Sequence, residues 1–432
     1  MKRIGKSLIH IIVIVAVIVV FYMMYSKYLD KKINELYLLN KQSVNHANGL
    51  SEKDKGNVLI NHSLAGGNLL VMGSSELSSP VSENPKNLFP NNLYEGDATF
   101  VGHAYVQNAL HAMNLGANFR YLDENDIVIV NSLQWFTDSD IVLDGFFSNF
   151  SELQFYEFLH NNMISDKNKK YLCKRYIHLE NLKESKLYPL LNEYIENILG
   201  KSILGTIEAT GYQMVSGELT YDQTYILARL YTSDSIIGKM LYQVFQPYYW
   251  FRYQFLVLKD KYKSYKWLKE MDSVQSGESI KSLDWKEIYE DAEKEGKAAC
   301  TNNDLYVYDE YYIDYIKENY EDIRGRNSET ELLISNEWND YKFFLDICND
   351  LELHPYIVIM STNGLYYDYL GMDKEKRNAF YEKAEQIAKD YGMECLNLKD
   401  YEYQPYFYCD VMHLGWKGWT YVVQNIIEHY EE

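Results

Sequence analysis

The pattern of apolar and polar positions begins with an apolar run at residues 8–25, in which His10 is the one strongly polar position. In an α-helix, eighteen residues span about 27 Å, close to the hydrocarbon thickness of a bilayer. A secretory signal peptide has a shorter apolar stretch and a small-residue cleavage site, and Ser26-Lys27-Tyr28 provides no such site. We therefore predict an uncut transmembrane anchor at 8–25 behind a cytoplasmic tail at 1–7.

The orientation of this anchor does not follow from charge alone, because three basic residues precede the run and three follow it closely. A seven-residue tail is easily left in the cytoplasm, and a long domain can be exported whatever its charge. We therefore expect residues 30–432 to lie outside the cytoplasmic membrane.

Short apolar runs rich in β-branched residues recur at 68–72, 127–130 and 356–360. Such runs are typical of strands in a parallel sheet that is covered on both faces. Helical periodicity is found at 106–114, 373–391 and 416–430. The alternation predicts an α/β fold with a doubly wound parallel sheet in residues 66–432.

Two segments depart from this alternation. Residues 26–65 mix Lys, Asn, Ser and Glu with weak helical periodicity, and we predict a membrane-proximal stalk there. Residues 145–330 are rich in Tyr and Leu and mainly helical in pattern. We predict that they form a large helical insertion, which acts as a lid or a packing layer.

The composition narrows the functional classes. Hydrophobic residues make up 47% of the chain and aromatic residues 15%, which excludes a disordered protein. The net charge of −20 argues against nucleic acid as a partner. The five cysteines are scattered and form no Cys-x-x-Cys pair, so we expect neither a zinc site nor a disulfide framework, and no metal or other cofactor.

Ser74 and Ser75 follow Gly73 directly after the first apolar run. A hydroxyl on a tight turn between a strand and a helix lies at the carboxyl edge of the sheet, where a helix N-terminus favours negative charge. The same residues also fit an ordinary turn with a serine N-cap. This motif alone therefore does not identify a nucleophile.

A second motif stands before the last helical stretch, where Asp410 precedes His413 by three residues. From one loop, the carboxylate can fix the tautomer and orientation of the imidazole, which leaves its other nitrogen to face a nucleophile. The alternative is an Asp that caps the helix and a His in its first turn.

Together, the Gly-x-Ser turn and the Asp-x-x-His motif resemble the SGNH (GDSL-type) hydrolase superfamily. Its nucleophile is the third residue of Gly-Asp-Ser, which corresponds to Ser75, and Ser74 takes the place of the Asp. The resemblance implies a catalytic triad of Ser75, His413 and Asp410. Reaction at Ser74 remains the alternative.

The chain resembles more closely the DltD family, the D-alanyl transfer proteins of teichoic acid modification. The resemblance is carried by the N-terminal run and by residues 73–77, 101–107, 132–136, 149–154, 363–369 and 410–418. Two departures stand out: His103-Ala104 replaces Arg-Gly of the family, and Leu133 replaces a Pro.

The same resemblance implies further site residues. In SGNH enzymes the oxyanion is held by the nucleophile's amide, a Gly amide after the second strand and an Asn after the next strand. Gly102 fits the second group, and Gln134 stands where the Asn is expected, with Asn131 as its competitor. Trp135 and Asn363 are expected to contact substrate.

The resemblance also implies a function, D-alanylation of lipoteichoic acid through a D-alanyl ester on Ser75. It implies as partners lipoteichoic acid, a membrane-bound O-acyltransferase (DltB) and a D-alanyl carrier protein (DltC). Two other functions fit the same residues. One is an esterase or O-acetyltransferase acting on cell-wall glycans or lipids, and the other is a non-enzymatic scaffold for a membrane acyltransferase.

Overall fold

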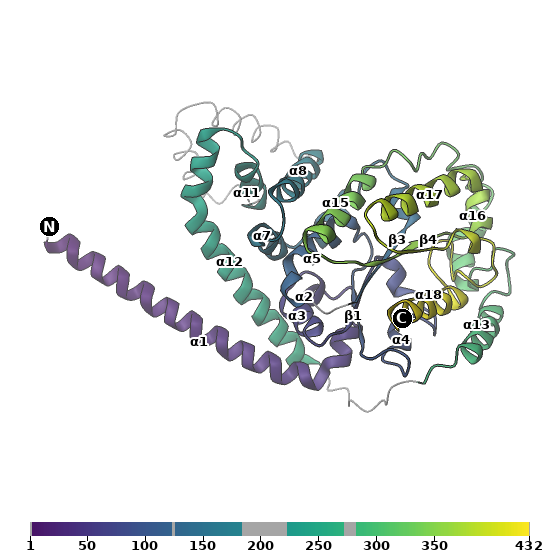
Figure 1. Cartoon of the computed structure of the whole chain (residues 1–432), viewed down its shortest axis with the longest axis horizontal. Helices are drawn as coiled ribbons and strands as arrows, with labels where there is room; N and C mark the ends of the chain where they lie inside the picture. Colours follow the sequence, from purple (N-terminus) through teal and green to yellow (C-terminus); the bar gives the residue numbers. More distant parts are fainter. Residues whose placement is uncertain (1, 123–125, 184–222, 272–281, 432) are drawn as a thin grey trace.

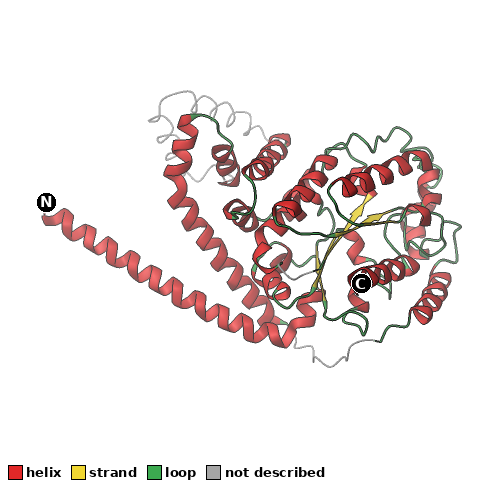
Figure 2. Ribbon diagram, in the orientation of Figure 1, coloured by secondary structure: helices red, strands yellow, loops and turns green. Residues whose placement is uncertain are grey.

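The computed structural model describes residues 2–122, 126–183, 223–271 and 282–431, without the side chains of 2–9, 11, 12 and 15. Its centre is a sheet of five parallel strands (Figure 2): β1 (Leu69–Met72), β2 (Ala98–Val101), β3 (Ile127–Ser132), β4 (Tyr356–Met360) and β5 (Cys395–Asn397). The strand order is β2-β1-β3-β4-β5. This is a doubly wound order with its topological switch point beside β1, where ligands of such sheets bind.

The three predicted strands are thus confirmed, and β2 and β5 are additional. In register, Met72 pairs with Val101 on one side and with Ile129 on the other. The carboxyl ends of β1, β2 and β3 therefore meet at one edge of the sheet. The loops that follow these three strands carry the predicted nucleophile and oxyanion groups.

Helices cover both faces of the sheet, which explains the continuous apolar runs. Helices on the first face are α5 (Asn108–Asn118), α15 (Glu337–Asp350) and α17 (Lys374–Asp390). Helices on the second face are α4 (Pro85–Leu88), α13 (Trp285–Ala299) and α18 (Trp416–Glu431). In β1, Leu70 and Met72 join the core on the first face, and Leu69 and Val71 the core on the second. Because side chains alternate along a strand, burial on both faces requires an apolar residue at every position.

The crossover from β3 to β4 contains the segment predicted as a helical insertion. Its described helices are α6 (Leu143–Asn149), α7 (Glu152–His160), α8 (Asp166–Leu182), α11 (Gln223–Tyr231), α12 (Ile236–Glu270), α13 and α14 (Asp309–Tyr311). Parts of 145–330 lie outside the described residues. After β4, the short helix α16 (Gly364–Tyr369) precedes α17.

The chain begins with α1 (Lys2–His46), a long helix whose N-terminal half extends away from the rest of the molecule (Figure 1). The segment predicted as a stalk, 26–65, contains the second half of α1 followed by α2 (Ser51–Asp54) and α3 (Val58–Leu64). The buried Lys53 donates to the carbonyls of Val44 at 2.8 Å and Asn45 at 2.6 Å. A cation at this place satisfies the last carbonyls of a helix and ties its end to the domain.

Within the part of the chain that the structure describes, no helix is long and apolar enough to cross a membrane. Five side chains of the 8–25 run, at positions 8, 9, 11, 12 and 15, lie outside that part. The transmembrane anchor therefore stays a prediction.

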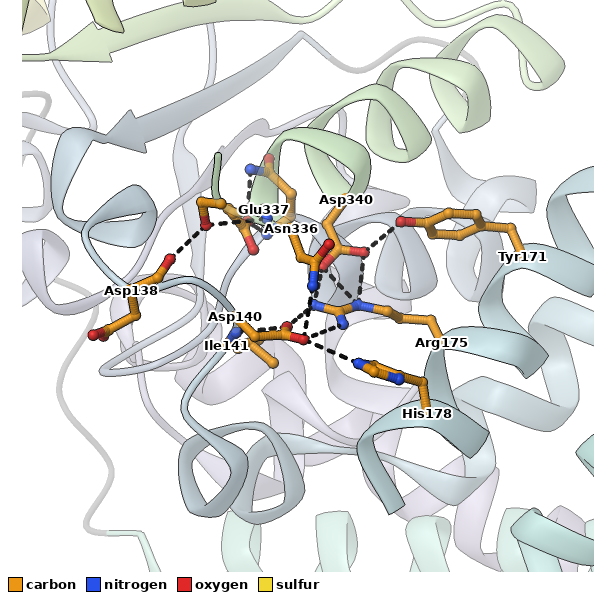
Figure 3. Close-up of polar contacts among 11 residues, drawn as sticks. Asp138, Asp140, Ile141, Tyr171, Arg175, His178, Asn336, Glu337 and Asp340 are labelled. Atoms are coloured by element: carbon orange, nitrogen blue, oxygen red, sulfur yellow. Dashed lines mark hydrogen bonds and ion pairs between the residues drawn. The ribbon is translucent and has the colours of Figure 1, made fainter. Parts of the chain in front are cut away.

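A buried ionic network holds the loop that follows β3 (Figure 3). Arg175 on α8 donates from Nε and Nη2 to Oδ2 of Asp340 on α15, at 2.9 and 2.7 Å, and from Nη1 to Asp140 at 3.1 Å. Burial alone would raise the pKa of Asp140, but the Arg175 guanidinium outweighs it and lowers this pKa to about 2. Ser335 Oγ also donates to the carbonyl of Asp138 at 2.7 Å. The network fixes residues 138–140 against two helices.

Candidate active site

Ser75 lies at the carboxyl end of β1, where the chain turns through Gly73 and Ser74. It begins a one-turn 3₁₀ helix, Ser75–Ser78. A single 3₁₀ turn has little macrodipole, so the environment of the Ser75 hydroxyl depends mainly on its side-chain partners.

His413 is the partner of that hydroxyl. Its Nε2 atom lies 2.8 Å from Ser75 Oγ, and its Nδ1 atom lies 2.6 Å from Oδ2 of Asp410. The carboxylate accepts a hydrogen bond from Nδ1–H, so Nε2 is left to accept the hydrogen bond from the Ser75 hydroxyl. The structure thus brings Ser75 to the pair of Asp410 and His413, although Ser75 and His413 are 338 positions apart along the chain.

The loop from Tyr408 to Leu414 fixes this arrangement. These two residues form an isolated antiparallel bridge, which closes the loop. Oδ1 of Asp410 accepts the backbone N–H groups of Met412 and His413, both at 2.8 Å. Both carboxylate oxygens are therefore engaged, and the imidazole is held from its side chain and from its backbone.

Electrostatics favour a proton on His413. Burial of the ring disfavours the imidazolium, but the hydrogen bond and charge of Asp410, with the charge of Glu76, outweigh burial and raise the pKa of His413. A higher pKa makes the imidazole a stronger base toward the Ser75 hydroxyl.

Glu76 is a residue that the sequence analysis missed. Its side chain is buried, and Oε1 accepts the N–H of Ser74 at 2.7 Å. Burial raises the pKa of Glu76 to about 7, against the lowering effects of the backbone hydrogen bonds and of His413. The sequence could have indicated this residue, because an acidic side chain directly follows the candidate nucleophile.

Ser74 is turned away from the imidazole. Its hydroxyl donates to the carbonyl of His103 at 3.1 Å, and its side chain is almost fully buried. Of the two serines, Ser75 is the one in hydrogen-bond distance of His413. The bond from Ser74 instead joins the turn after β1 to the loop after β2.

Gly102, after β2, packs closely against the turn that carries Ser75. Its φ is +117°, and a Cβ at this position would lie 1.9 Å from the carbonyl oxygen of Gly73. Only glycine allows this close approach of the two backbones. The fully buried His111 packs below, and burial lowers its pKa to about 3, so its ring is neutral.

A cleft of about 200 Å³ opens in front of Ser75. Gln134 and Trp135 line it from the loop after β3, and Met412 lines it from the Asp410 loop. The Trp135 ring is largely buried and stacks on His111, with 5.9 Å between the ring centroids. Asn131, the alternative to Gln134, is fully buried within β3 and is not part of this lining.

Asn363 lies apart from the cleft. Its side chain caps α16 by accepting the N–H of Tyr366 at 3.1 Å and donates to the carbonyl of Leu305 at 2.7 Å. Its backbone N–H donates to the carbonyl of Val411 at 3.2 Å. In this structure Asn363 therefore supports the loop of Asp410 and His413 and does not face Ser75.

The family motif around Asn363 has a second structural role. Asp368 accepts from Nη1 of the fully buried Arg377 at 2.8 Å, and Arg377 Nε donates to Glu402 at 2.7 Å. These pairs join α16 and α17 to the chain that leads into the site. In the described ranges, no group of three or more His, Cys, Asp and Glu side chains is arranged to hold a metal ion.

The chain is similar over nearly its whole length to one protein family. The sequence model of the family described as "DltD protein" matches residues 48–431. That span contains the Ser75 turn, the Gly102 loop, the cleft and the loop of Asp410 and His413.

Three individual proteins named for the same family are also similar to the chain. The chain is 28% identical to "Protein DltD" of Bacillus subtilis (strain 168), over 84% of this chain and 82% of the relative. It is 24% identical to "Protein DltD" of Staphylococcus aureus (strain NCTC 8325 / PS 47), over 98% and 96%. It is 22% identical to "Protein DltD" of Lacticaseibacillus rhamnosus, over 86% and 79%.

Proposed function

The chain belongs to the DltD family, which serves the D-alanylation of lipoteichoic acid, and we propose that it does so by serine acyl transfer through a D-alanyl ester on Ser75. The observation that carries this proposal is the line of hydrogen bonds from Ser75 Oγ to His413 and on to Asp410, at 2.8 and 2.6 Å. A serine, a histidine base and an orienting carboxylate in this order are the parts of an activated nucleophile.

In the proposed mechanism, His413 takes the proton of Ser75 as its Oγ attacks the carbonyl of an activated D-alanyl ester or thioester. Asp410 holds the Nδ1–H tautomer and stabilises the imidazolium that forms. The imidazolium then gives its proton to the leaving group, and the acyl group remains on Ser75. A hydroxyl of the teichoic acid polymer attacks this ester in turn and gives its proton to His413. The bond between the acyl group and Ser75 Oγ then breaks, and the imidazolium returns the proton to Oγ.

The tetrahedral intermediates need hydrogen-bond donors for their oxyanion. We assign this role to the backbone N–H groups of Ser75 and Gly102 and to the side chain of Gln134. The support is the close approach of Gly102 to the Ser75 turn and the position of Gln134 in the wall of the same cleft. Trp135, in that wall, is proposed to contact the acyl donor or the acceptor.

We further propose that α1 anchors the protein to the cytoplasmic membrane by residues 8–25, with the SGNH-like domain outside. Val17, Ile18 and Phe21 are more than half exposed on α1, which is unfavourable in water and favourable in lipid. The proposed partners are lipoteichoic acid, a membrane-bound O-acyltransferase (DltB) and a D-alanyl carrier protein (DltC).

The experiment that tests the proposal is labelling of the full-length protein with a fluorophosphonate probe in detergent. Labelling should be lost in Ser75→Ala and His413→Ala and kept in Ser74→Ala, because Ser75, and not Ser74, lies within hydrogen-bond distance of the imidazole. Labelling that survives Ser75→Ala would refute the assignment.

A complementation assay separates catalysis from scaffolding. Cells that carry Ser75→Ala should lose the D-alanyl content of lipoteichoic acid if the ester on Ser75 is required, and should keep it if the protein only presents its partners. Parallel hydrolysis assays on D-alanylated and O-acetylated polymers distinguish the proposed activity from that of a cell-wall esterase.

A further inference from the structure

The described chain carries a second large apolar surface, on the outward side of α12. Its side chains recur at intervals of four or seven residues, which places them on one side of the helix: Ile236, Met240, Val244, Phe251, Phe255 and Tyr262. Ile236 is 79% exposed and Val244 is 70% exposed. A continuous row of this length indicates a surface that contacts another apolar medium.

The opposite side of α12 is joined to the domain. Asp260 accepts the backbone N–H groups of Asn57 and Val58, at 2.9 and 3.0 Å, and so caps α3. Arg252 Nη2 donates to Glu152 on α7 at 2.7 Å. The outward row is therefore held in place by a rigid attachment on the inner side.

The contacts between α12 and α1 indicate which medium surrounds the apolar row of α12. Tyr22 bonds Gln254 at 2.8 Å, Lys261 bonds Ser26 at 2.8 Å, and the Tyr28 ring contacts the Tyr265 ring. Residue numbers rise together along both helices, so α1 and α12 run toward a common meeting region at these residues and diverge from it toward their N-termini (Figure 1). The part of α12 before Gln254 and the apolar run of α1 therefore both extend away from this meeting region, at an angle to each other (Figure 1).

The boundary between apolar and charged sequence lies at the same level in both helices. In α1, no Asp, Glu, Lys or Arg occurs from position 7 to 26, and Lys27 is the first to follow. In α12, Lys239 lies near the start of the helix, positions 240–258 contain one such residue, the paired Arg252, and charges become frequent from Lys259 onward. The bond from Lys261 to Ser26 places these two transitions side by side.

We propose that the outward row of α12, from Ile236 to Phe255, lies in the lipid of the bilayer that the apolar half of α1 enters, with Tyr262 at the lipid–water boundary. The inference rests on the membrane anchor proposed above. Aromatic side chains at a lipid–water boundary and lysines just beyond it are the composition that such a boundary selects. The protein would then be held by two helices in a fixed orientation, with one of them embedded from the side.

The test uses the full chain reconstituted in vesicles of phosphatidylglycerol and phosphatidylethanolamine. A fluorophore is attached to Val244→Cys or Phe251→Cys, with Val17→Cys as the anchor reference. Lys286→Cys on α13, whose side chain is 87% exposed, is the water reference. The protein without an added cysteine gives the background from Cys395, which is partly exposed.

A nitroxide on the lipid acyl chain is expected to quench positions 244, 251 and 17, and aqueous iodide to quench position 286 alone. If iodide quenches 244 and 251 while 17 remains lipid-quenched, the row faces water and the proposal is overturned, although the anchor stands. Protection of 244 and 251 from both quenchers would show that protein covers the row, and this too overturns it. If iodide quenches 17 as well as 244 and 251, both the anchor and the proposal fail.

Discussion

Oε1 of Glu76 accepts the backbone N–H of Ser74 at 2.7 Å, so the residue after Ser75 fixes the residue before it. The carboxyl group is buried, and its charge also acts on His413. Glu76 therefore influences both the shape of the turn and the basicity of the imidazole. It acts through the Ser74 N–H and through its charge.

Glu76→Gln should separate these two effects. The amide oxygen can still accept the Ser74 N–H, whereas the negative charge that helps to raise the pKa of His413 is lost. Because the pKa of Glu76 is about 7, this charge is present mainly near and above that pH. The part of the pH–rate profile near pH 7, which reports the formation of neutral His413, should therefore shift to lower pH. Glu76→Ala is the matched control, because it leaves a buried N–H unpaired, at a cost of about 1–3 kcal/mol of stability. An unchanged profile near pH 7 in Glu76→Gln would contradict the electrostatic role.

The stability of the folded protein should also depend on Glu76. Its pKa is about 7 in the fold against 4.5 for an ordinary carboxyl, so the native state keeps a proton that the unfolded chain releases between these pH values. The unfolding free energy should fall as pH rises through this window and level off above it. Denaturant titrations from pH 4 to 8 should show a flatter curve for Glu76→Gln. The same slope in both proteins would assign it to other groups.

Much of this site could be predicted from the sequence, because its chemistry requires particular residue types. Ser75, Asp410 and His413 stand in motifs whose spacing limits their geometry, and the apolar runs of β1, β3 and β4 indicate strands buried on both faces. β2 contains Thr99, and β5 has only three half-buried residues, so neither gives a clear apolar run.

Other features could not be read, because they depend on tertiary contacts. Glu76 acts through a backbone bond, and Arg175 lies in a Lys-rich helical stretch where burial has no local signature. Asn363 was expected at the substrate, but its amide is used by the Tyr366 N–H and the Leu305 carbonyl. A motif shared with a family does not tell whether a residue meets the ligand or supports the loop that does.

Substitution of the orienting carboxylate should reduce activity more than stability. In Asp410→Asn, the amide can present its NH₂ group to Nδ1 and favour the tautomer that carries its proton on Nε2, which cannot accept the Ser75 proton. Fluorophosphonate labelling rates should fall by roughly 10³-fold or more. Thermal unfolding shows whether the fold is retained. A labelling rate within a few-fold of the native protein would remove Asp410 from the mechanism.

Gly102→Ala should damage the site through the backbone. The added methyl group would meet the Gly73 carbonyl at 1.9 Å, which forces the turn of Ser75 to move. Gly67→Ala is the matched control, because Gly67 also has a positive φ, of +68°, but nothing lies within 4 Å of its Cβ position. The control should lose only the 1–2 kcal/mol, roughly, that a left-handed alanine costs. Equal labelling of the two variants would argue against the close approach at Gly102.

Arg175 should be a main determinant of stability on the cleft side of the molecule. Asp340 is fully buried, so Arg175→Ala leaves a buried carboxylate without its charge partner, which costs about 3–5 kcal/mol. Lys167→Ala is the control, because Lys167 pairs with Asp346 at 3.0 Å but is 80% exposed and should contribute at most about 1 kcal/mol. Urea unfolding measures both. Asp140 also loses its partner, so the loop that carries Gln134 and Trp135 should become more mobile. Labelling of Ser75 should therefore slow at urea concentrations well below the midpoint of unfolding. A loss of stability equal to that of the control would mean that Asp340 is not ionised in the native protein and that the network acts through hydrogen bonds alone.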